Sequence, residues 1–158
     1  MYRVRKVTVF RVLDFFRVEN ILYRCGKDMA QKYGLQHWNN GHIKNLLIVA
    51  LCFLKNDIFL VFDDNKPIAT FQTKKCGDGL RLQKLATDPC FSGKGVGSFC
   101  LKTVEEMAKA ADCKKVFFDV YDKSQHAAHF YENRGYTPCG SINTLKYTEV
   151  RMEKLLEK

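Results

Sequence analysis

The sequence contains little proline, with 3 residues in 158, and only 10 glycines, and it shows no repeat or low-complexity tract. These absences exclude collagen-like and disordered chains, which are rich in one or both of these residues. Hydrophobic residues make up 46% of the chain and are spread along its length. A chain of this size buries enough apolar surface for one core. We therefore predict a single globular domain over residues 1–158.

Long apolar runs are also missing. The longest, Leu46 to Leu54, is followed by Lys55-Asn56-Asp57, whereas a membrane span needs about 20 mostly apolar residues. The basic start of the chain does not lead into the apolar core of a signal peptide. We therefore expect a cytoplasmic protein with no membrane partner.

The cysteines lack the spacing of a disulfide framework or a Cys-x-x-Cys metal pair, because no two of the seven lie closer than ten positions. We expect no metal and no disulfide. Free cysteine is among the most buried residue types, so most of these thiols are predicted to be small core residues in a reducing compartment.

Acidic residues are fewer than basic ones, 17 against 26, which gives a formal net charge of +9. Such a charge is also typical of proteins that bind nucleic acids, so a nucleic-acid-binding module is an alternative function. However, the basic residues are scattered and no RNA-recognition or zinc signature occurs, so we do not expect a nucleic-acid partner. A salt-dependent affinity for bulk DNA or RNA would favour this alternative.

Hydrophobic periodicity predicts an alternation of strands and helices. Asp14 and Ser124 are predicted N-caps, and Gly34 and Gly135 lie where helices are expected to end. The predicted strands are 2–10, 58–62, 67–73, 80–87, 115–121 and 147–155. The predicted helices are 14–33, a buried 46–53, one that follows the glycines at 93, 95 and 97, and 124–134. For the short apolar run 46–53, a strand is the alternative. This order indicates an α/β or α+β fold with helices on both faces of a sheet.

The most informative stretch is Ser92-Gly93-Lys94-Gly95-Val96-Gly97-Ser98, which follows the strand ending Leu85-Ala86-Thr87-Asp88-Pro89. Glycines lack the Cβ atom that keeps a ligand away from the backbone, and the helix behind them begins with unpaired N–H groups. A phosphate group would fit there. The spacing matches neither a Rossmann fingerprint nor a nucleoside-triphosphate loop. A tight connecting turn is the alternative interpretation.

A second motif, Ala127-Ala128-His129-Phe130-Tyr131-Glu132-Asn133-Arg134-Gly135-Tyr136, lies about thirty residues downstream. Together the two motifs resemble the GNAT superfamily of acyl-coenzyme A dependent N-acetyltransferases. That family's motifs read roughly L-x-V-x-P, then Q/R-x-x-G-x-G/A, then N-x-x-A-x-x-F/L-Y-x-x-x-G-F. The match covers about Leu80 to Tyr136.

The resemblance implies a mixed, mostly antiparallel sheet of six to seven strands with helices on both faces. A splayed parallel pair of strands would hold coenzyme A. It also implies transfer of an acetyl group from acetyl-CoA to a primary amine of a small molecule or peptide, by direct attack in a ternary complex and without a metal. Whether the protein forms a homodimer is left open at this point.

The resemblance assigns roles to individual residues. Tyr131 resembles the general acid that protonates the leaving thiolate, with an amphipathic core tyrosine as the alternative. Trp38 and Gln83 are candidates for the acceptor site, although Trp38 could equally plug the core. His126 and His129 are expected to be solvated surface groups. The residues implied in coenzyme binding are Leu85, Ala86, Thr87, Ser92, Gly93, Lys94, Gly95, Val96, Gly97, Ser98, Ser124 and Ala127.

The sequence departs from the family pattern at a few positions. Ser92 stands where Gln or Arg is usual, Ser124 replaces Asn, and Thr87 replaces Val. The two serines are the support for an alternative function, an acyl-CoA sensor that does not transfer the acyl group. A basic protein attracts the polyanionic coenzyme and repels polycationic acceptors, which favours neutral or anionic amines.

Overall fold

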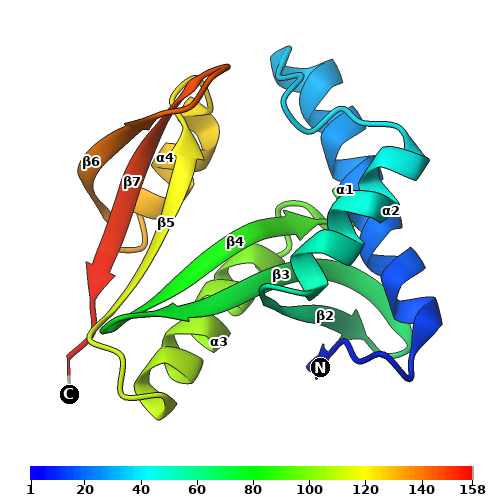
Figure 1. Ribbon diagram of the computed structural model, residues 1–158, viewed down its shortest axis with the longest axis horizontal. Coiled ribbons are helices and arrows are strands. Elements are labelled where there is room, and N and C mark those ends of the chain that lie inside the picture. The colour runs from blue at the N-terminus through cyan, green and yellow to red at the C-terminus, as the bar shows by residue number, and fades with distance from the viewer. Residues whose placement is uncertain (158) are drawn as a thin grey trace. The chain divides into compact units, whose positions relative to one another are not determined.

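The structure is a computed structural model that describes residues 1–157. Within them the chain forms seven strands, four α-helices and one 3₁₀ helix (Figure 1). The elements are β1 (Tyr2–Lys6), α1 (Val12–Tyr33), α2 (His42–Phe53), β2 (Asp57–Asp63), β3 (Lys66–Cys76), β4 (Gly79–Thr87), η1 (Pro89–Phe91), α3 (Val96–Ala110), β5 (Lys115–Tyr121), α4 (Gln125–Glu132), β6 (Thr137–Asn143) and β7 (Thr148–Leu155).

The seven strands form one sheet in the order β1-β2-β3-β4-β5-β7-β6. β1 pairs with β2 and β2 with β3 in antiparallel fashion, and so do β5 with β7 and β7 with β6. β4 and β5 are parallel, and their register pairs Gly79–Arg81 with Lys115–Phe117. The predicted fold class is therefore confirmed: α+β, with a mostly antiparallel sheet that contains one parallel pair.

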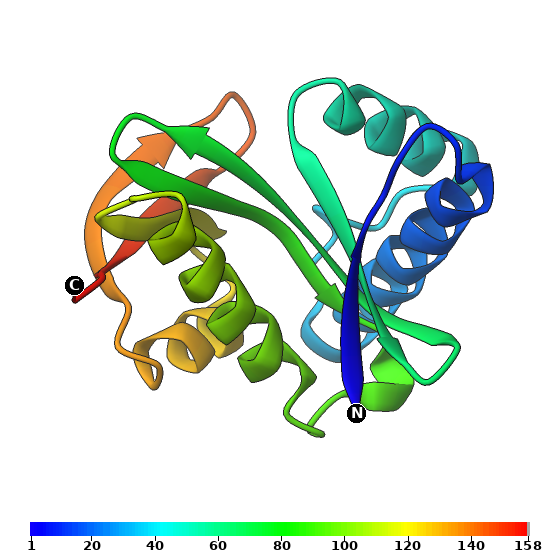
Figure 2. The same ribbon diagram turned by 90° about the horizontal axis from the view of Figure 1, so that it is seen from below.

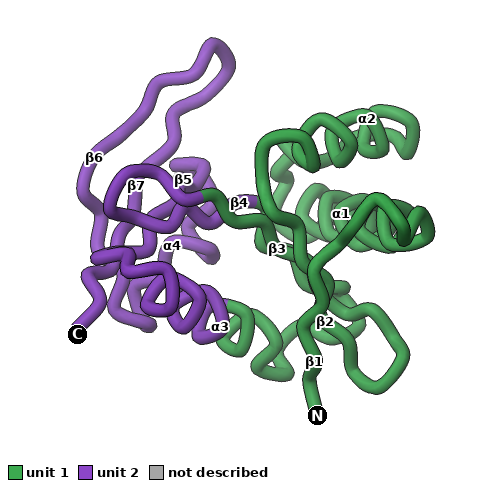
Figure 3. The backbone as a smooth tube through the Cα atoms, turned by 60° about the horizontal axis from the view of Figure 1, so that its bottom comes forward, with its two compact units in different colours: residues 1–74, 84–100 green, residues 75–83, 101–158 purple. Residues whose placement is uncertain are grey.

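The chain divides into two compact units (Figure 3). Unit 1 comprises residues 1–74 and 84–100, and unit 2 comprises residues 75–83 and 101–158. β3, β4 and α3 contribute residues to both units. The expectation of one domain over residues 1–158 stays a prediction.

In unit 1, the helices α1 and α2 lie side by side (Figures 1 and 2). α1 ends as predicted at Gly34, whose φ of 68° lets its N–H donate to the carbonyl of Ala30 at 3.1 Å. Apolar side chains of both helices meet those of β2 and β4 in one core. Its buried members are Val7, Val18, Ile21, Leu22, Val49, Ile58, Leu60, Phe62 and Ala86.

The prediction that Asp14 caps α1 is wrong. The helix begins at Val12, with Arg11 in the N-cap position, and Asp14 lies in the first turn. Its carboxylate is 1% exposed and accepts hydrogen bonds from Arg5 at 2.6 Å and Arg17 at 2.8 Å. These two guanidinium groups offset the cost of burying the charge, so the residue joins β1 to α1.

The first strand is also shorter than predicted, because it ends at Lys6 rather than at Phe10. The chain turns directly afterwards: the carbonyl of Thr8 accepts the N–H of Arg11 at 3.0 Å. The N–H of Val7 still donates to Ile58 at 2.8 Å, and its side chain is buried. The alternation therefore continues for one residue beyond the strand and then stops.

The prediction of a buried helix over 46–53 is right about the helix and wrong about its burial. Asn45 and Val49 are its buried residues. An apolar run fills every side of a helix, and only one stripe of it can face the core. The other stripe, Ile43, Leu47 and Leu51, is exposed by 61–79%.

In unit 2, β5 alternates between buried and half-buried residues as predicted, with Val116, Phe118 and Val120 buried. β6 was not predicted from the sequence. It is an edge strand whose seven residues are almost all exposed, and it contains Pro138 and Gly140, so it has no alternating pattern to recognise.

The predicted helix over 124–134 ends earlier, at Glu132. Ser124 occupies the N-cap position as predicted, but its side chain makes no capping hydrogen bond; its carbonyl accepts the N–H groups of Ala127 and Ala128 at 3.0 Å. Gly135 has a φ of 83° after the end of the helix, in agreement with the prediction.

Candidate functional site

The end of β4 is fixed to α1 by Asp88. This buried carboxylate accepts a hydrogen bond from the Arg24 guanidinium at 2.6 Å and another from the backbone N–H of Cys90 at 2.9 Å. The second bond caps the 3₁₀ helix η1. Arg24 also donates to the Cys90 sulfur at 3.2 Å. The loop that follows β4 therefore starts from a rigid anchor within unit 1.

The glycine-rich loop forms a cradle, which we define as residues 92–98. Gly93 and Gly95 have φ angles of 75° and 80°, in the left-handed region that glycine adopts without strain. Beyond their chain neighbours, no described atom lies within 4 Å of where a Cβ on either residue would stand. α3 begins directly behind them at Val96. The first backbone N–H groups of a helix have no intrahelical acceptor, so this geometry suits an anion.

Aromatic and basic side chains support the cradle from within unit 1. The Tyr2 hydroxyl donates to the carbonyl of Lys94 at 3.2 Å, and its ring meets Phe99 edge-on at 5.3 Å. The ammonium groups of Lys66 and Lys94 each lie 4.9 Å from the centroid of the Phe91 ring. Two cations thus stand beside the cradle, which further favours an anionic ligand.

β4 carries a backbone irregularity just before the residues predicted to hold the coenzyme arm. Lys84 has a φ of 47°, which is uncommon for a residue with a side chain and often marks a functional site. Leu85 to Thr87 follow it, beyond the last described pair of β4 with β5 at Arg81. The Ala86 side chain lies in the core of unit 1, so Ala86 could offer a ligand its main chain but not its side chain.

Two cysteines of unit 1, Cys25 and Cys100, are poor nucleophiles. Burial, together with the charges of Asp28 and Asp88, raises the pKa of Cys25 to about 12. A hydrogen bond with the backbone of Thr87 acts in the opposite direction but is outweighed. Burial likewise raises the pKa of Cys100 to about 12. All seven cysteines are free thiols, but two are exposed and three half-buried, so the prediction that most are buried is wrong.

Trp38 lies in the segment between α1 and α2, half-buried against the core of unit 1. Its ring centroid is 5.5 Å from the ammonium group of Lys84 on β4. Its backbone carbonyl packs against Gly26 of α1 so closely that a Cβ at Gly26 would clash with it. The residue therefore packs at the edge of the core and also borders β4. Its place in the acceptor site stays a prediction.

We expect Gly26→Ala to displace this segment, because the added Cβ meets backbone atoms that cannot rotate away. Overpacking of this kind lowers the free energy of unfolding by about 1–3 kcal/mol. Trp38 is the one tryptophan of the chain, so its fluorescence emission reports the shift directly. Gly41→Ala is the matched control, since the space around Gly41 is open; equal spectra and stabilities for the two variants would contradict the prediction.

In unit 2, Tyr131 lies on α4 and is half-buried in an aromatic cluster. Its ring centroid is 4.2 Å from that of Phe118 on β5, 5.1 Å from Phe130 and 6.1 Å from Tyr136. The Tyr136 hydroxyl is committed to Glu105, to which it donates at 3.0 Å. Ser124 and Ala127 lie on the same helix, Ser124 buried and Ala127 half-buried.

The predicted site residues thus fall into two sets. The cradle, Leu85 to Thr87 and Trp38 belong to unit 1, whereas Gln83, Ser124, Ala127 and Tyr131 belong to unit 2. Within unit 1, the cradle and β4 are consecutive, and Trp38 borders β4 through Lys84.

A model of the acetyltransferase (GNAT) family matches residues 21–136, a stretch that includes Trp38, β4, the cradle and Tyr131. The chain belongs to this family. The resemblance noted from the two motifs is therefore confirmed, and the chain is a member of the GNAT N-acetyltransferases. This GNAT chain is 34% identical over 59 residues to the uncharacterized protein YdhI of Bacillus subtilis (strain 168), and the alignment covers 37% of each protein.

Solved structures share the fold of this GNAT chain at low sequence identity. The PaiA N-acetyltransferase from Thermoplasma acidophilum, in complex with coenzyme A, has a TM-score of 0.75 and 17% identity, covering 98% of this chain and 99% of that one. An aminoglycoside 6'-N-acetyltransferase complexed with coenzyme A gives 0.75 and 11%, covering 99% and 98%. The ribosomal-protein-S18-alanine N-acetyltransferase from Escherichia coli gives 0.69 and 16%, covering 100% and 96%.

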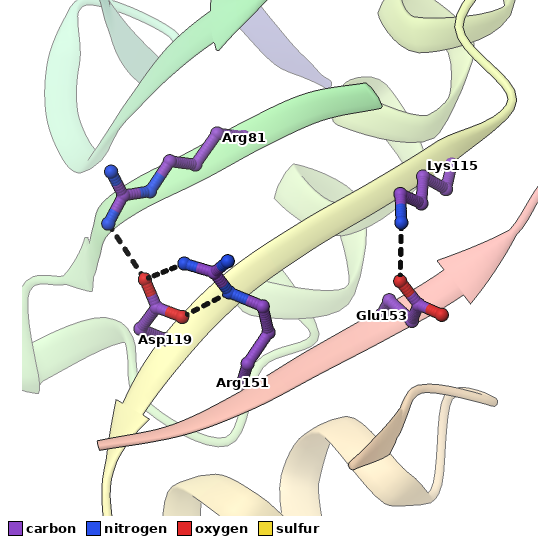
Figure 4. Close-up of polar contacts among 5 residues, drawn as sticks. All are labelled: Arg81, Lys115, Asp119, Arg151 and Glu153. Atoms are coloured by element: carbon purple, nitrogen blue, oxygen red, sulfur yellow. Dashed lines mark hydrogen bonds and ion pairs between the residues drawn. The ribbon is translucent and has the colours of Figure 1, made fainter. Parts of the chain in front are cut away.

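Sequence reasoning missed an ionic cluster of the GNAT chain next to Gln83 (Figure 4). Asp119 of β5 has a side chain that is 4% exposed, and it accepts hydrogen bonds from Arg81 of β4 at 2.7 Å and from Arg151 of β7 at 2.8 and 3.1 Å. The cluster ties three strands together where the described β4–β5 pairing ends. No local sequence pattern reveals it, because its members come from three distant segments.

The ionisation of Asp119 follows from this setting. Burial acts to raise the pKa of its carboxyl group, but the hydrogen bonds and charges of Arg151 and Arg81 outweigh burial and hold the pKa below its usual value. A carboxyl group whose pKa is lowered on folding stabilises the folded state above its unfolded pKa, and this contribution is lost as the pH falls through the folded value. The stabilisation is therefore present at neutral pH, begins to decrease below about pH 4 and is lost as the pH falls through the folded pKa.

We expect Asp119→Asn to lower the free energy of unfolding at pH 7 by about 2 kcal/mol, because it leaves two guanidinium groups without their shared charge partner. The arginines are about one third exposed, which keeps the loss below that of a fully buried pair. Denaturant unfolding at pH 7 and at pH 3 measures it, and the difference from wild type should shrink at pH 3. Glu153→Gln, which breaks the neighbouring pair with Lys115 (Figure 4), is the control and should cost clearly less stability than Asp119→Asn, because this pair is more exposed to solvent. A difference of the same size at pH 3 as at pH 7 would show that the charge is not responsible.

The histidines and possible metal ligands of the GNAT chain add no further group to the site. His126 and His129 are exposed, as expected, and partial burial lowers the pKa of His126. Among residues 1–157, no three His, Cys, Asp or Glu side chains gather in a way that could hold a metal ion. No described helix is long and apolar enough to cross a membrane.

Proposed function

We propose that this chain transfers an acetyl group from acetyl-CoA to the primary amine of a small molecule or peptide. The observation that carries the proposal is the cradle: two left-handed glycines with open space above them, at the start of a helix, in a chain of the GNAT family. The backbone N–H groups at the start of α3 and the ammonium group of Lys94 would hold the diphosphate of the coenzyme. When bound, acetyl-CoA supplies the acyl group as an activated thioester.

The main chain of Leu85 to Thr87 would bind the pantetheine arm in the way that a neighbouring strand does. Two observations support this assignment. The left-handed residue Lys84 interrupts the regular strand just before these residues, and the Ala86 side chain is used in the core, so its backbone is the part left for a ligand. Trp38 and Gln83 would border the acceptor, and Ser124 and Ala127 would lie near the pantetheine arm or the thioester.

The transfer step needs a neutral amine, although alkylamines have pKa values near 10.4, so the acceptor must lose a proton before it attacks. The amine nitrogen bonds to the thioester carbonyl carbon, and the carbon–sulfur bond breaks. The Tyr131 hydroxyl would donate its proton to the leaving sulfur and regain one from the solvent. The amine proton passes to water or to a base that stays unassigned.

The charge of the chain bears on the acceptor. With a net charge of +9, the protein attracts a polyanionic coenzyme and repels a polycationic acceptor. We therefore propose neutral or anionic amines as the acceptor class.

The release of free thiol from acetyl-CoA, measured across a panel of neutral, anionic and cationic amines, tests the function. We expect release that depends on the amine and is fastest with a neutral or anionic acceptor. Thermal unfolding with coenzyme A tests binding separately, since a ligand at about 100 times its dissociation constant adds roughly 2.7 kcal/mol of stability. Stabilisation without amine-dependent thiol release would indicate a sensor. The absence of both would refute the proposal.

A further inference from the structure

Unit 1 exposes large apolar side chains on three neighbouring segments, which we together call the apolar face. It consists of the loop after β1, the first turns of α1 and the outer stripe of α2. Its members are Val9, Phe10, Val12, Leu13, Phe16, Ile43, Leu47, Leu51 and Leu54, with exposures from 51% to 92%. Soluble monomers rarely expose so many large apolar side chains together, so such a face marks an interaction surface.

A groove runs through the apolar face between the loop after β1 and α2. It has a volume of about 420 Å³, and all of its lining side chains are apolar: Val9, Phe15, Leu47, Ala50, Leu51, Phe53 and Leu54. Two of the lining residues join α1 to α2, because the ring of Phe15 packs edge-on against that of Phe53, with 4.9 Å between the ring centroids. The side chains of the groove can therefore make apolar contacts with a partner but cannot form hydrogen bonds with it.

The charges around the apolar face are positive. Lys44 and Lys55 flank the stripe of α2, Arg11 lies between Phe10 and Val12, and all three are exposed. Residues 42–56 contain no Asp or Glu. The acidic residues of the neighbouring elements are already paired: Asp14 with Arg5 and Arg17, Glu19 with His42 at 2.8 Å, and Asp57 with Lys6 at 2.7 Å.

Three kinds of occupant fit an exposed apolar surface, and the charges and the lining separate them. A second copy in a two-fold arrangement would bring Arg11, Lys44 and Lys55 close to their own equivalents, with no free carboxylate on this face to offset the repulsion. A protein partner needs about one hydrogen bond per 100–200 Å² of interface, and the groove lining provides no side chain for it. A lipid bilayer needs apolar side chains for its acyl boundary and cations for its headgroups.

We propose that the apolar face docks onto an anionic phospholipid surface, with α2 lying in the plane of the interface. Phe10 and Leu54, exposed by 92% and 79%, would enter the acyl boundary, and Arg11, Lys44 and Lys55 would contact the headgroup phosphates. The expectation of no membrane partner was drawn from the absence of a membrane-spanning segment; the proposed surface would lie on a bilayer without crossing it.

Co-sedimentation of the full chain with phospholipid vesicles tests the proposal. We expect at least about tenfold stronger binding to vesicles of phosphatidylcholine with one quarter phosphatidylglycerol than to pure phosphatidylcholine, and a loss of this difference at high salt. The double variant Phe10→Asp with Leu54→Asp should lose at least tenfold in binding to the mixed vesicles. The pair Lys44→Glu with Lys55→Glu should lose the preference for the anionic lipid.

Matched controls lie in unit 2, where Leu145 is fully exposed and Lys123 is exposed. Leu145→Asp and Lys123→Glu each make one change of the same kind outside the apolar face as defined, and they should bind vesicles like the wild type. All of the substituted side chains are exposed, so circular dichroism and thermal unfolding should show that each variant folds. Equal binding to both kinds of vesicle, or unchanged binding of the Phe10 and Leu54 variant, would overturn the proposal. So would a lipid-free dimer that this variant dissociates, because the face would then join two copies of the chain.

Discussion

Gly95→Val is expected to weaken coenzyme A binding by about 100-fold or more. A Cβ at this position would stand in the open space of the cradle, and a β-branched side chain disfavours the φ of 80° that the loop needs there. Each charge-assisted hydrogen bond from the backbone contributes about 1.5–3 kcal/mol, so the loss of one or two accounts for this change. Isothermal titration with coenzyme A measures the dissociation constant.

The chain offers a matched control for backbone strain. Gly77 has a φ of 59° in the β3–β4 turn, again with no neighbour within 4 Å of a Cβ, and that turn contains none of the predicted site residues. Gly77→Val should lower thermal stability about as much as Gly95→Val while leaving coenzyme affinity within about twofold of the wild type. If both variants bind coenzyme A normally, the cradle does not hold the diphosphate.

Local patterns predicted the elements that local physics determines. The hairpin of β2 and β3 follows from turn-forming residues between two apolar runs, and Asp64 in its turn adopts the left-handed conformation that Asp tolerates, with a φ of 51°. β5 alternates because one of its faces is buried, where Phe118 contacts Tyr131 of α4. Gly34 and Gly135 follow helices where a left-handed residue is needed. In each case a few neighbouring residues contain the whole reason for the structure.

The predictions failed where partners distant in the sequence decide the structure. Asp14 has the residue type of an N-cap, but Arg5 draws its carboxylate into a buried ion pair. The apolar run of α2 could not indicate which stripe would find a neighbour. β6 has exposed residues and a proline, and its place is set by pairing with β7. A one-dimensional pattern does not contain these contacts.

The candidate site divides in the same way. The glycines of the cradle could be predicted because their function depends on backbone freedom, which a residue type shows directly. The supports of the cradle could not: Arg24 reaches Asp88 across 64 residues, and Tyr2 reaches Lys94 across 92. The groups that could bind a ligand can be recognised in a sequence. The residues that hold those groups in place are harder to recognise, because they come from distant segments.

Tyr131→Phe is expected to lower kcat by about 10²–10⁴-fold, the usual contribution of a positioned general acid, while coenzyme affinity stays within about twofold. The substitution removes the hydroxyl that would protonate the leaving sulfur and keeps the ring that packs on Phe118. The steady-state rate of thiol release, with the amine acceptor found by the panel, gives kcat. Titration with coenzyme A gives the affinity.

Tyr136→Phe is the matched control. It also removes one phenolic hydroxyl, and Tyr136 lies just after α4 in the same aromatic cluster. The Tyr136 hydroxyl is buried and donates to Glu105, which is also held by Lys154 at 2.9 Å. Its loss should cost about 1 kcal/mol of stability and leave kcat nearly unchanged. A wild-type kcat for Tyr131→Phe would remove Tyr131 from the chemistry and leave it a core residue. Equal losses of kcat in both variants would show that the aromatic cluster acts by packing, since a proton donor must be one particular hydroxyl.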